Sequence, residues 1–114
     1  MIANVDESDW RRFRRSVSEW RERYLQTVNE EINVLTTPGD RTPTEAFWEI
    51  KDRVDAEAKI LQACLDGHSR SNMSIHLIRM LQHGMICEAD LDDFSHELRD
   101  QILASIEEFG RRSE

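Results

Sequence analysis

The strongest constraint on this chain is one uninterrupted apolar stripe in the first third of its sequence. Large apolar residues recur there at steps of three and four: Trp10, Phe13, Val17, Trp20, Tyr24, Val28, Ile32 and Leu35. This spacing puts them on one face of an α-helix and predicts a helix from about residue 8 to residue 35. A rise of about 1.5 Å per residue makes that helix roughly 40 Å long. Because this exceeds the width of a small domain, the helix needs a partner along its length.

A second helix is predicted by the clearest local signal in the chain, Thr42-Pro43-Thr44-Glu45. This run combines a threonine N-cap, a proline at the first helical position and a glutamate three residues after the cap, which together make a capping box. The helix is expected over about residues 43–65, and Asp66-Gly67 marks its end. Its apolar face consists of Phe47, Ile50, Val54, Ala58, Leu61 and Leu65.

Two further helices are expected over about residues 72–83 and 88–109, and Gly84 and Gly110 are placed to end them. Apolar residues cover most of the circumference of the third helix, which is typical of a central, buried helix. No stretch alternates apolar and polar residues as a strand does. We therefore predict an all-α fold: a single domain over residues 1–114 with four helices, whose long amphipathic first helix takes part in a dimeric helical bundle.

The composition of the 114 residues limits the class of protein. The chain has 23 acidic against 15 basic side chains, a formal net charge of −8 at pH 7, and 39% hydrophobic residues, enough for a modest core. No apolar run approaches the roughly 20 residues that span a bilayer, and the acidic segment Met1–Asp9 lacks the features of a signal peptide. Cys64 and Cys87 stand in no metal or redox spacing. We expect an acidic cytoplasmic protein without disulfides.

Positive charge is concentrated in the first predicted helix. Between Trp10 and Tyr24 the chain has six arginines and two glutamates, whereas the rest of the chain is acidic. Acidic helices of the same protein are the nearest counter-charges, so we expect charge complementarity within the chain or across a dimer interface. Neither nucleic acid nor a membrane is expected as a partner.

The same helix predicts self-association. Its aromatic stripe presents more surface than one shorter antiparallel neighbour covers, and exposed apolar patches of that size are rare on monomers. A two-fold homodimer would cover the excess, with Trp20 in the apolar seam. Helix faces, particularly the basic side from Arg11 to Arg23, are expected to contact an unknown protein partner. The predicted interaction residues are Arg11, Arg12, Arg14, Arg15, Trp20, Arg21, Arg23 and Trp48.

Two pairs of residues have the composition of metal ligands. His83 stands four residues before Cys87, and Asp93 stands three residues before His96. Gly84 breaks the turn between the first pair, and a di-iron site of the helical-bundle type needs a second carboxylate–histidine pair and two further glutamates. We therefore expect no metal site and no cofactor.

Arg70 and His76, six residues apart at the start of the third predicted helix, resemble the Arg-x(4–6)-His signature of HEPN-domain ribonucleases. The resemblance implies an all-α ribonuclease in which His76 performs acid–base chemistry and Arg70 steadies the charge of the scissile phosphate. Ser71 stands where that family often has an amide or a histidine, and a net charge of −8 repels RNA. This ribonuclease is the alternative in which the protein is an enzyme.

Phe47-Trp48-Glu49-Ile50-Lys51-Asp52 is similar to the Trp-x-Leu-His-Asp helix segment of the cyanobacterial fluorescence recovery protein family. Leu81-Gln82-His83-Gly84, followed by Asp90-Leu91, is similar to its later helix–loop–helix. The resemblance implies an all-α dimeric regulator, and a distant relationship to this family is the second alternative. Lys51 replaces the family's histidine, Ala58 stands where an arginine is expected, and the Tyr-Asp-Tyr-Arg run is absent.

The motifs of common enzymes are absent from the chain. It has no phosphate-binding glycine loop and no Gly-x-Ser-x-Gly turn. We therefore predict a small regulatory or adaptor protein that acts by protein–protein interaction and has no catalytic residues.

Overall fold

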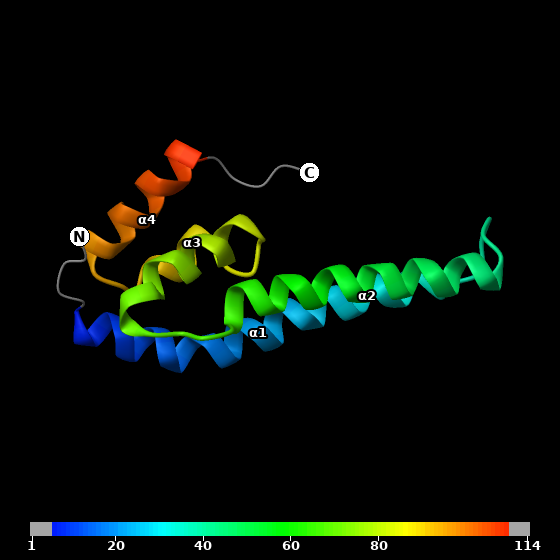
Figure 1. Cartoon of the computed structure of the whole chain (residues 1–114), viewed down its shortest axis with the longest axis horizontal. Coiled ribbons are helices and arrows are strands. Elements are labelled where there is room, and N and C mark those ends of the chain that lie inside the picture. Colours follow the sequence, from blue (N-terminus) through cyan, green and yellow to red (C-terminus); the bar gives the residue numbers. More distant parts are fainter. Residues whose placement is uncertain (1–5, 110–114) are drawn as a thin grey trace.

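The structure, a computed structural model, describes residues 6–109, and these form helices and turns only (Figure 1). Four α-helices follow one another: α1 (Glu7–Leu35), α2 (Pro43–Leu65), α3 (Met73–Gln82) and α4 (His96–Phe109). Short 3₁₀-helices precede the last two, η1 (Arg70–Asn72) before α3 and η2 (Glu88–Leu91) before α4. The predicted all-α class is confirmed for the described residues.

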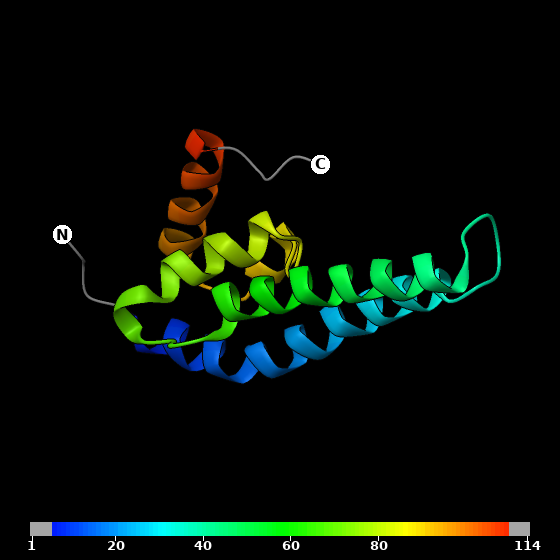
Figure 2. The same cartoon turned by 45° about the vertical axis from the view of Figure 1, so that its right-hand side comes forward.

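The two long helices form a hairpin that determines the shape of the molecule. α1 and α2 lie side by side and run in opposite directions, while α3 and α4 gather at one end of them (Figures 1 and 2). α3 packs against both α2 and α4. The molecule measures 54 × 28 × 23 Å along its principal axes. The end of the hairpin that holds the α1–α2 connection therefore projects beyond the other helices.

The start of α2 has the geometry of the predicted capping box. The Glu45 amide donates to Thr42 Oγ1 over 3.1 Å, and the Thr42 amide donates to Glu45 Oε1 over 2.9 Å. Pro43 occupies the start of the helix, where its missing N–H costs no hydrogen bond. The two reciprocal bonds satisfy amides that have no intrahelical acceptor. This part of the prediction is confirmed.

Replacing Thr42 with alanine should lower the free energy of unfolding by about 1 kcal/mol, the usual loss for an N-cap side chain. Thr44→Ala is the matched control, because Thr44 is an exposed threonine in the same helical turn. Urea unfolding followed by circular dichroism measures both variants. Equal stability of Thr42→Ala and the unmodified protein would contradict the cap.

Two of the three predicted glycine stops, Gly67 and Gly84, have the left-handed backbone that favours glycine, and the third, Gly110, lies outside the described residues. The φ angle is +72° at Gly67 and +79° at Gly84. After Gly84, the amides of Met85 and Ile86 donate to the Met80 carbonyl over 2.8 and 3.4 Å, and both side chains are buried. The chain therefore leaves α3 with the hydrophobic contact that accompanies this kind of helix end.

The fourth predicted helix, over about residues 88–109, is wrong in its first part. The structure has η2 over Glu88–Leu91, then a turn, and α4 only from His96. Leu91 and Phe94 are buried in the core although neither belongs to α4. The same spacing of apolar residues occurs whether this segment is one continuous helix or a 3₁₀-helix and a turn followed by α4. The periodicity therefore does not reveal the break between η2 and α4.

The start of α4 is set by Asp9, a buried carboxylate in the first turn of α1. The Ser95 amide and hydroxyl donate to Asp9 Oδ1 and Oδ2 over 2.8 and 2.6 Å. Ser95 in turn caps α4, because its Oγ accepts from the Leu98 amide over 3.3 Å and its carbonyl from the Arg99 amide over 3.0 Å. A contact between residues 86 positions apart leaves no local pattern in the sequence.

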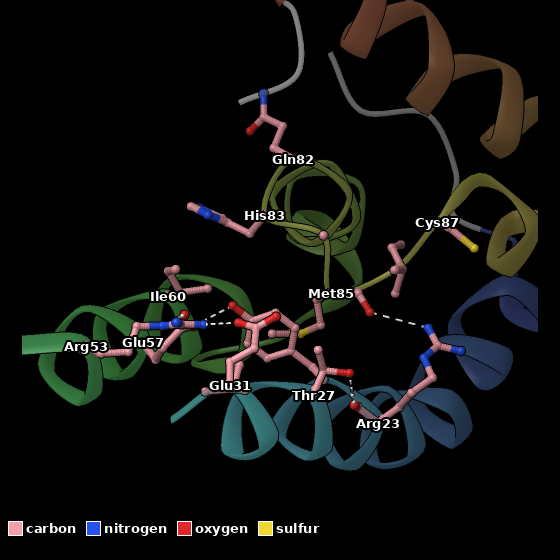
Figure 3. A pocket seen from close by; sticks show the side chains of 14 residues that line it. Arg23, Thr27, Glu31, Arg53, Glu57, Ile60, Gln82, His83, Met85 and Cys87 are labelled. Carbon is pink, nitrogen blue, oxygen red and sulfur yellow. Dashed lines mark hydrogen bonds and ion pairs between the residues drawn. The ribbon is translucent and has the colours of Figure 1, made fainter. Parts of the chain in front are cut away.

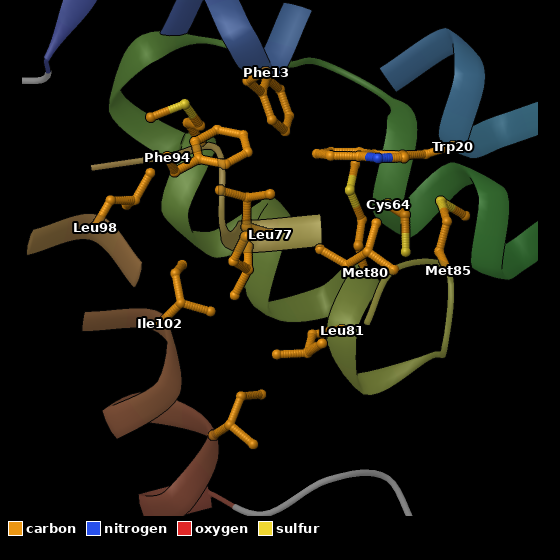
Figure 4. Close-up of a cluster of buried hydrophobic side chains, with 14 of the residues drawn as sticks. Phe13, Trp20, Cys64, Leu77, Met80, Leu81, Met85, Phe94, Leu98 and Ile102 are labelled. Atoms are coloured by element: carbon orange, nitrogen blue, oxygen red, sulfur yellow. The ribbon is translucent and has the colours of Figure 1, made fainter. Parts of the chain in front are cut away.

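The hydrophobic core lies where the first half of α1 meets α3, α4 and the end of α2 (Figure 4). Trp20 is only 4% exposed, and its ring lies against Phe94 with centroids 6.2 Å apart. The buried cluster consists of Trp10, Phe13, Trp20, Cys64, Met73, Leu77, Met80, Leu81, Met85, Ile86, Leu91, Phe94, Leu98, Ile102 and Ile106. The α1 stripe beyond Tyr24 lies outside this cluster, on the projecting part of the hairpin.

Candidate functional site

Exposed apolar side chains gather on the projecting part of the hairpin. Five large apolar side chains are exposed within the described residues, and four belong to the hairpin: Val34, Phe47, Trp48 and Val54. Phe47 is 60% exposed and Trp48 is 53% exposed, and their rings meet edge to face with centroids 5.0 Å apart. Two adjacent aromatic rings in solvent are a candidate contact surface, and they include one predicted interaction residue, Trp48.

Phe47 also begins an apolar stripe along α2, which consists of Phe47, Val54, Ala58, Leu61 and Leu65 (the α2 stripe). Steps of three, four and seven residues place these side chains on one face of the helix. Leu61 and Leu65 are half-buried and pack against the core. Phe47 and Val54, nearer the projecting end, are exposed. The same helix face is therefore covered at one end and open at the other.

Phe47 and Val54 are missing from the predicted interaction residues. The sequence places both on the apolar face of the second helix, and the available signal is the seven-residue spacing from Phe47 through Val54 to Leu61. That spacing shows that the apolar face continues along the helix from Phe47 to Leu61. It does not show which part of the face the other helices cover, because that depends on where α3 and α4 pack along the hairpin.

A chain of polar contacts joins α1 to α2 in the middle of the hairpin (Figure 3). The Tyr24 hydroxyl donates to Glu57 Oε1, and Arg53 donates to Glu57 Oε2 over 2.8 Å and to Glu31 Oε1. Burial raises the pKa of the Tyr24 hydroxyl, and the neighbouring Glu57 carboxylate raises it further. Tyr24 is therefore protonated at neutral pH and acts as a donor that fixes the register of the two helices.

The same polar residues form one wall of a groove of about 960 Å³, opposite the turn that follows α3 (Figure 3). Arg23 lies in this groove and donates to both Asp90 carboxylate oxygens, over 3.1 and 2.7 Å, and to the Met85 carbonyl over 3.3 Å. Arg53, Glu57 and Arg23 thus have their partners within the chain. These three groups offer no unpaired charge to a ligand.

The predicted arginine residues fall into two groups. Arg21 and Arg23 have carboxylate partners, Glu22 at 3.0 Å and Asp90 at 2.7 Å. No carboxylate of the described residues makes an ion pair with the other four: Arg11, Arg12, Arg14 and Arg15. Of the predicted arginines, Arg23 therefore forms an ion pair with a carboxylate from a distant part of the chain, Asp90. The first four arginines form no such pair with a described residue.

Trp20, which the sequence places in a dimer seam, lies in the core of the single chain. Trp10, Phe13 and Trp20 are 9%, 0% and 4% exposed. Residues beyond α2, such as Phe94, pack against these aromatic rings, so their burial within one chain needs no second copy. The homodimer itself stays a prediction, and three of the five exposed large apolar side chains of the described residues lie on α2: Phe47, Trp48 and Val54.

His68 and His76 share one acceptor at the end of α2. His68 Nε2 lies 2.8 Å and His76 Nδ1 lies 3.0 Å from the Cys64 carbonyl oxygen, one of the last four carbonyls of the helix. His76 is 3% exposed, and the two imidazole rings meet with centroids 4.5 Å apart. Both rings thus serve as caps for the C-terminus of α2.

Arg70 has a different environment from His76. It is exposed and donates to Glu7 through two bonds, over 2.6 and 3.1 Å, and its guanidinium lies over the Trp10 ring at 5.4 Å. The two residues of the ribonuclease alternative are therefore divided between a surface ion pair and a buried helix cap. The alternative stays a prediction, and this geometry adds no support to it.

Protonation of His76 should destabilise the protein. Burial lowers the pKa of His76, and the adjacent His68 lowers it further. Below about pH 6.5, the ordinary histidine pKa, the unfolded chain therefore binds more protons than the folded chain at this position. The free energy of unfolding should consequently fall as the pH decreases from about 7.5 towards 5.5.

Urea unfolding at several pH values measures this effect. His76→Asn keeps a donor near the Nδ1 position and should remove part of the pH dependence. His96→Asn, at an exposed histidine, is the matched control. An unfolding free energy of the unmodified protein that rises towards pH 5.5 would contradict the prediction.

The residues considered as metal ligands do not converge. No group of three or more His, Cys, Asp or Glu side chains between residues 6 and 109 is arranged to hold a metal ion. Cys87 is exposed, whereas Cys64 is buried, and burial raises the pKa of the Cys64 thiol to about 11. Cys64 is therefore a protonated core side chain at neutral pH.

A function for this chain has to be inferred from its own surfaces, because the chain matches no protein family, no curated protein and no solved structure. No helix among the described residues is sufficiently long and apolar to cross a membrane.

Proposed function

We propose that this chain is a non-enzymatic regulatory or adaptor protein that acts as a homodimer, with the α2 stripe as the dimer seam. The observation that supports the proposal is the exposure of Phe47 and Val54 on a helix face whose other end is part of the core. The exposed parts of Phe47 and Trp48 alone present roughly 200 Å² of aromatic surface. With Val54 and Ala58 the exposed apolar area approaches that of the largest apolar patch on a typical monomer, which is often functional.

A second copy of the chain fits this face because the face is self-complementary. In a two-fold dimer with its axis at Val54, the two α2 helices run antiparallel and each apolar side chain meets apolar side chains of the other copy. Lys51 and Asp55 flank the stripe, and Lys51 Nζ lies 2.6 Å from its own Asp55 carboxylate. An antiparallel arrangement brings Lys51 of each copy towards the Asp55 side of the other, so the charges beside the seam have opposite signs.

Sedimentation equilibrium at micromolar concentration tests the proposal. The unmodified protein should have twice the mass of one 13.4 kDa chain. Val54→Asp places a charge in the apolar seam and should give a folded monomer, because Val54 is already 47% exposed in one copy. Circular dichroism checks that the variant keeps its helices.

Ile75→Asp is the matched control for Val54→Asp. Ile75 is 50% exposed and belongs to α3, not to the α2 stripe. The control should remain dimeric. A mass near 13.4 kDa for the unmodified protein would contradict the dimer. A dimer that Val54→Asp leaves intact would contradict the α2 stripe as its interface.

A further inference from the structure

We infer that the start of α1 carries a second docking surface, which binds a carboxylate-rich segment of a partner protein. This surface, the arginine face, consists of Arg11, Arg12, Arg14 and Arg15. Arg11, Arg14 and Arg15 are exposed and Arg12 is half-exposed. None of the four makes an ion pair with a described carboxylate. Four guanidinium groups within five residues are therefore available to an external anion.

The carboxylates nearest in sequence to the arginine face are already engaged. Asp6 caps α1 by accepting from the Ser8 amide over 2.8 Å. Glu7 accepts two bonds from Arg70, and Asp9 is buried and accepts two bonds from Ser95. The fold thus directs the first-turn acids to structural contacts. The neighbouring arginines form no ion pair with a described carboxylate. Arg11 nevertheless lies near Asp6 and Glu7: the hydrogen bonds from Ser8 and Arg70 lower the pKa of these two carboxyls, and Arg11 lowers it further. The net charge of the whole chain is −8.

Helix stability does not account for the arginine face. The four arginines lie in the second and third turns of α1, beyond the first turn in which the helix dipole acts on a charge, so the dipole gives them no favourable interaction. Arg23, further along α1, differs from these four arginines, because both oxygens of the Asp90 carboxylate accept hydrogen bonds from its guanidinium group. One contact does contribute to the arrangement of the face: the Arg14 guanidinium lies 5.8 Å from the centre of the buried Trp10 ring.

The chemistry and net charge together favour an acidic peptide over nucleic acid. Guanidinium groups bind carboxylates through paired N–H bonds, and arginines at positions i, i+3 and i+4 lie along one side of a helix. A short acidic segment bound at the arginine face is affected mainly by the arginines beside it, since charges beyond about 10 Å are screened at ordinary salt concentration. A long nucleic acid would extend its phosphates over the acidic remainder of the chain, which repels them.

Fluorescence anisotropy with a short fluorescein-labelled polyglutamate peptide tests the inference. The unmodified protein should bind at low salt and lose the peptide as the salt concentration rises. Arg11→Gln/Arg15→Gln should weaken binding about tenfold, since each exposed ion pair contributes up to about 1 kcal/mol. Lys59→Gln/Arg79→Gln removes the same charge from exposed positions on α2 and α3 and should change the affinity by less than about twofold.

Three results would overturn the arginine face as an acidic-peptide site. They are equal weakening by the Arg11→Gln/Arg15→Gln variant and by its control variant, no binding by the unmodified protein, and tighter binding of a single-stranded DNA with as many charges as the peptide. The Val54→Asp variant separates this inference from the dimer proposal, because its arginine face is intact. Peptide binding by that variant supports the arginine face whether or not the unmodified protein is a dimer.

Discussion

Replacing Trp20 with alanine should lower the free energy of unfolding by about 3–5 kcal/mol, the largest effect expected of any single substitution considered for this chain. Trp20 is 4% exposed and lies between Phe13 and Phe94, with ring centroids 6.3 and 6.2 Å away. Its loss removes a large apolar area from the core and leaves a cavity that rigid helices cannot close. Denaturant unfolding followed by circular dichroism measures the change.

Trp48→Ala is the matched control for Trp20→Ala. Trp48 has the same side chain but is 53% exposed on the hairpin, so in dilute protein its replacement should change the unfolding free energy by less than about 0.5 kcal/mol. In the proposed dimer the same variant should weaken self-association, since Trp48 adjoins the α2 stripe. Similar destabilisation by both substitutions would contradict the position of Trp20 in the core.

Asp9→Ala should lower the free energy of unfolding by about 1.5–3 kcal/mol, the range for a hydrogen bond to a charged group. The buried Asp9 carboxylate accepts from both the amide and the hydroxyl of Ser95. Without it the Ser95 amide has no acceptor, and the turn before α4 loses its attachment to α1. The variant should also show faster amide hydrogen exchange at the start of α4 than the unmodified protein.

Two controls define the Asp9 prediction. Ser95→Ala removes one of the two bonds and the hydroxyl that caps α4, so it should cost less than Asp9→Ala. Glu7→Ala removes an exposed carboxylate two residues away, and its surface ion pair with Arg70 contributes at most about 1 kcal/mol. If Glu7→Ala destabilised the protein as much as Asp9→Ala, the buried contact would not be the cause.

The sequence alone determined most of the helices, because their signals are local. The capping box at Thr42 and Glu45 needs only residues three apart, and the stops at Gly67 and Gly84 need only a residue that tolerates positive φ. Apolar spacing likewise locates a helix from residues within a few turns. Each of these features acts within one helix, so no knowledge of the rest of the chain is required.

The tertiary structure decided where α4 begins and which surfaces remain open. α4 starts at His96 because Asp9, far away in sequence, holds Ser95. Trp20 is buried and Val54 is exposed, although both belong to regular apolar stripes, because α3 and α4 pack at one end of the hairpin only. Periodicity states which face of a helix is apolar. Whether that face is covered depends on contacts between residues distant in sequence, which only the packed chain defines.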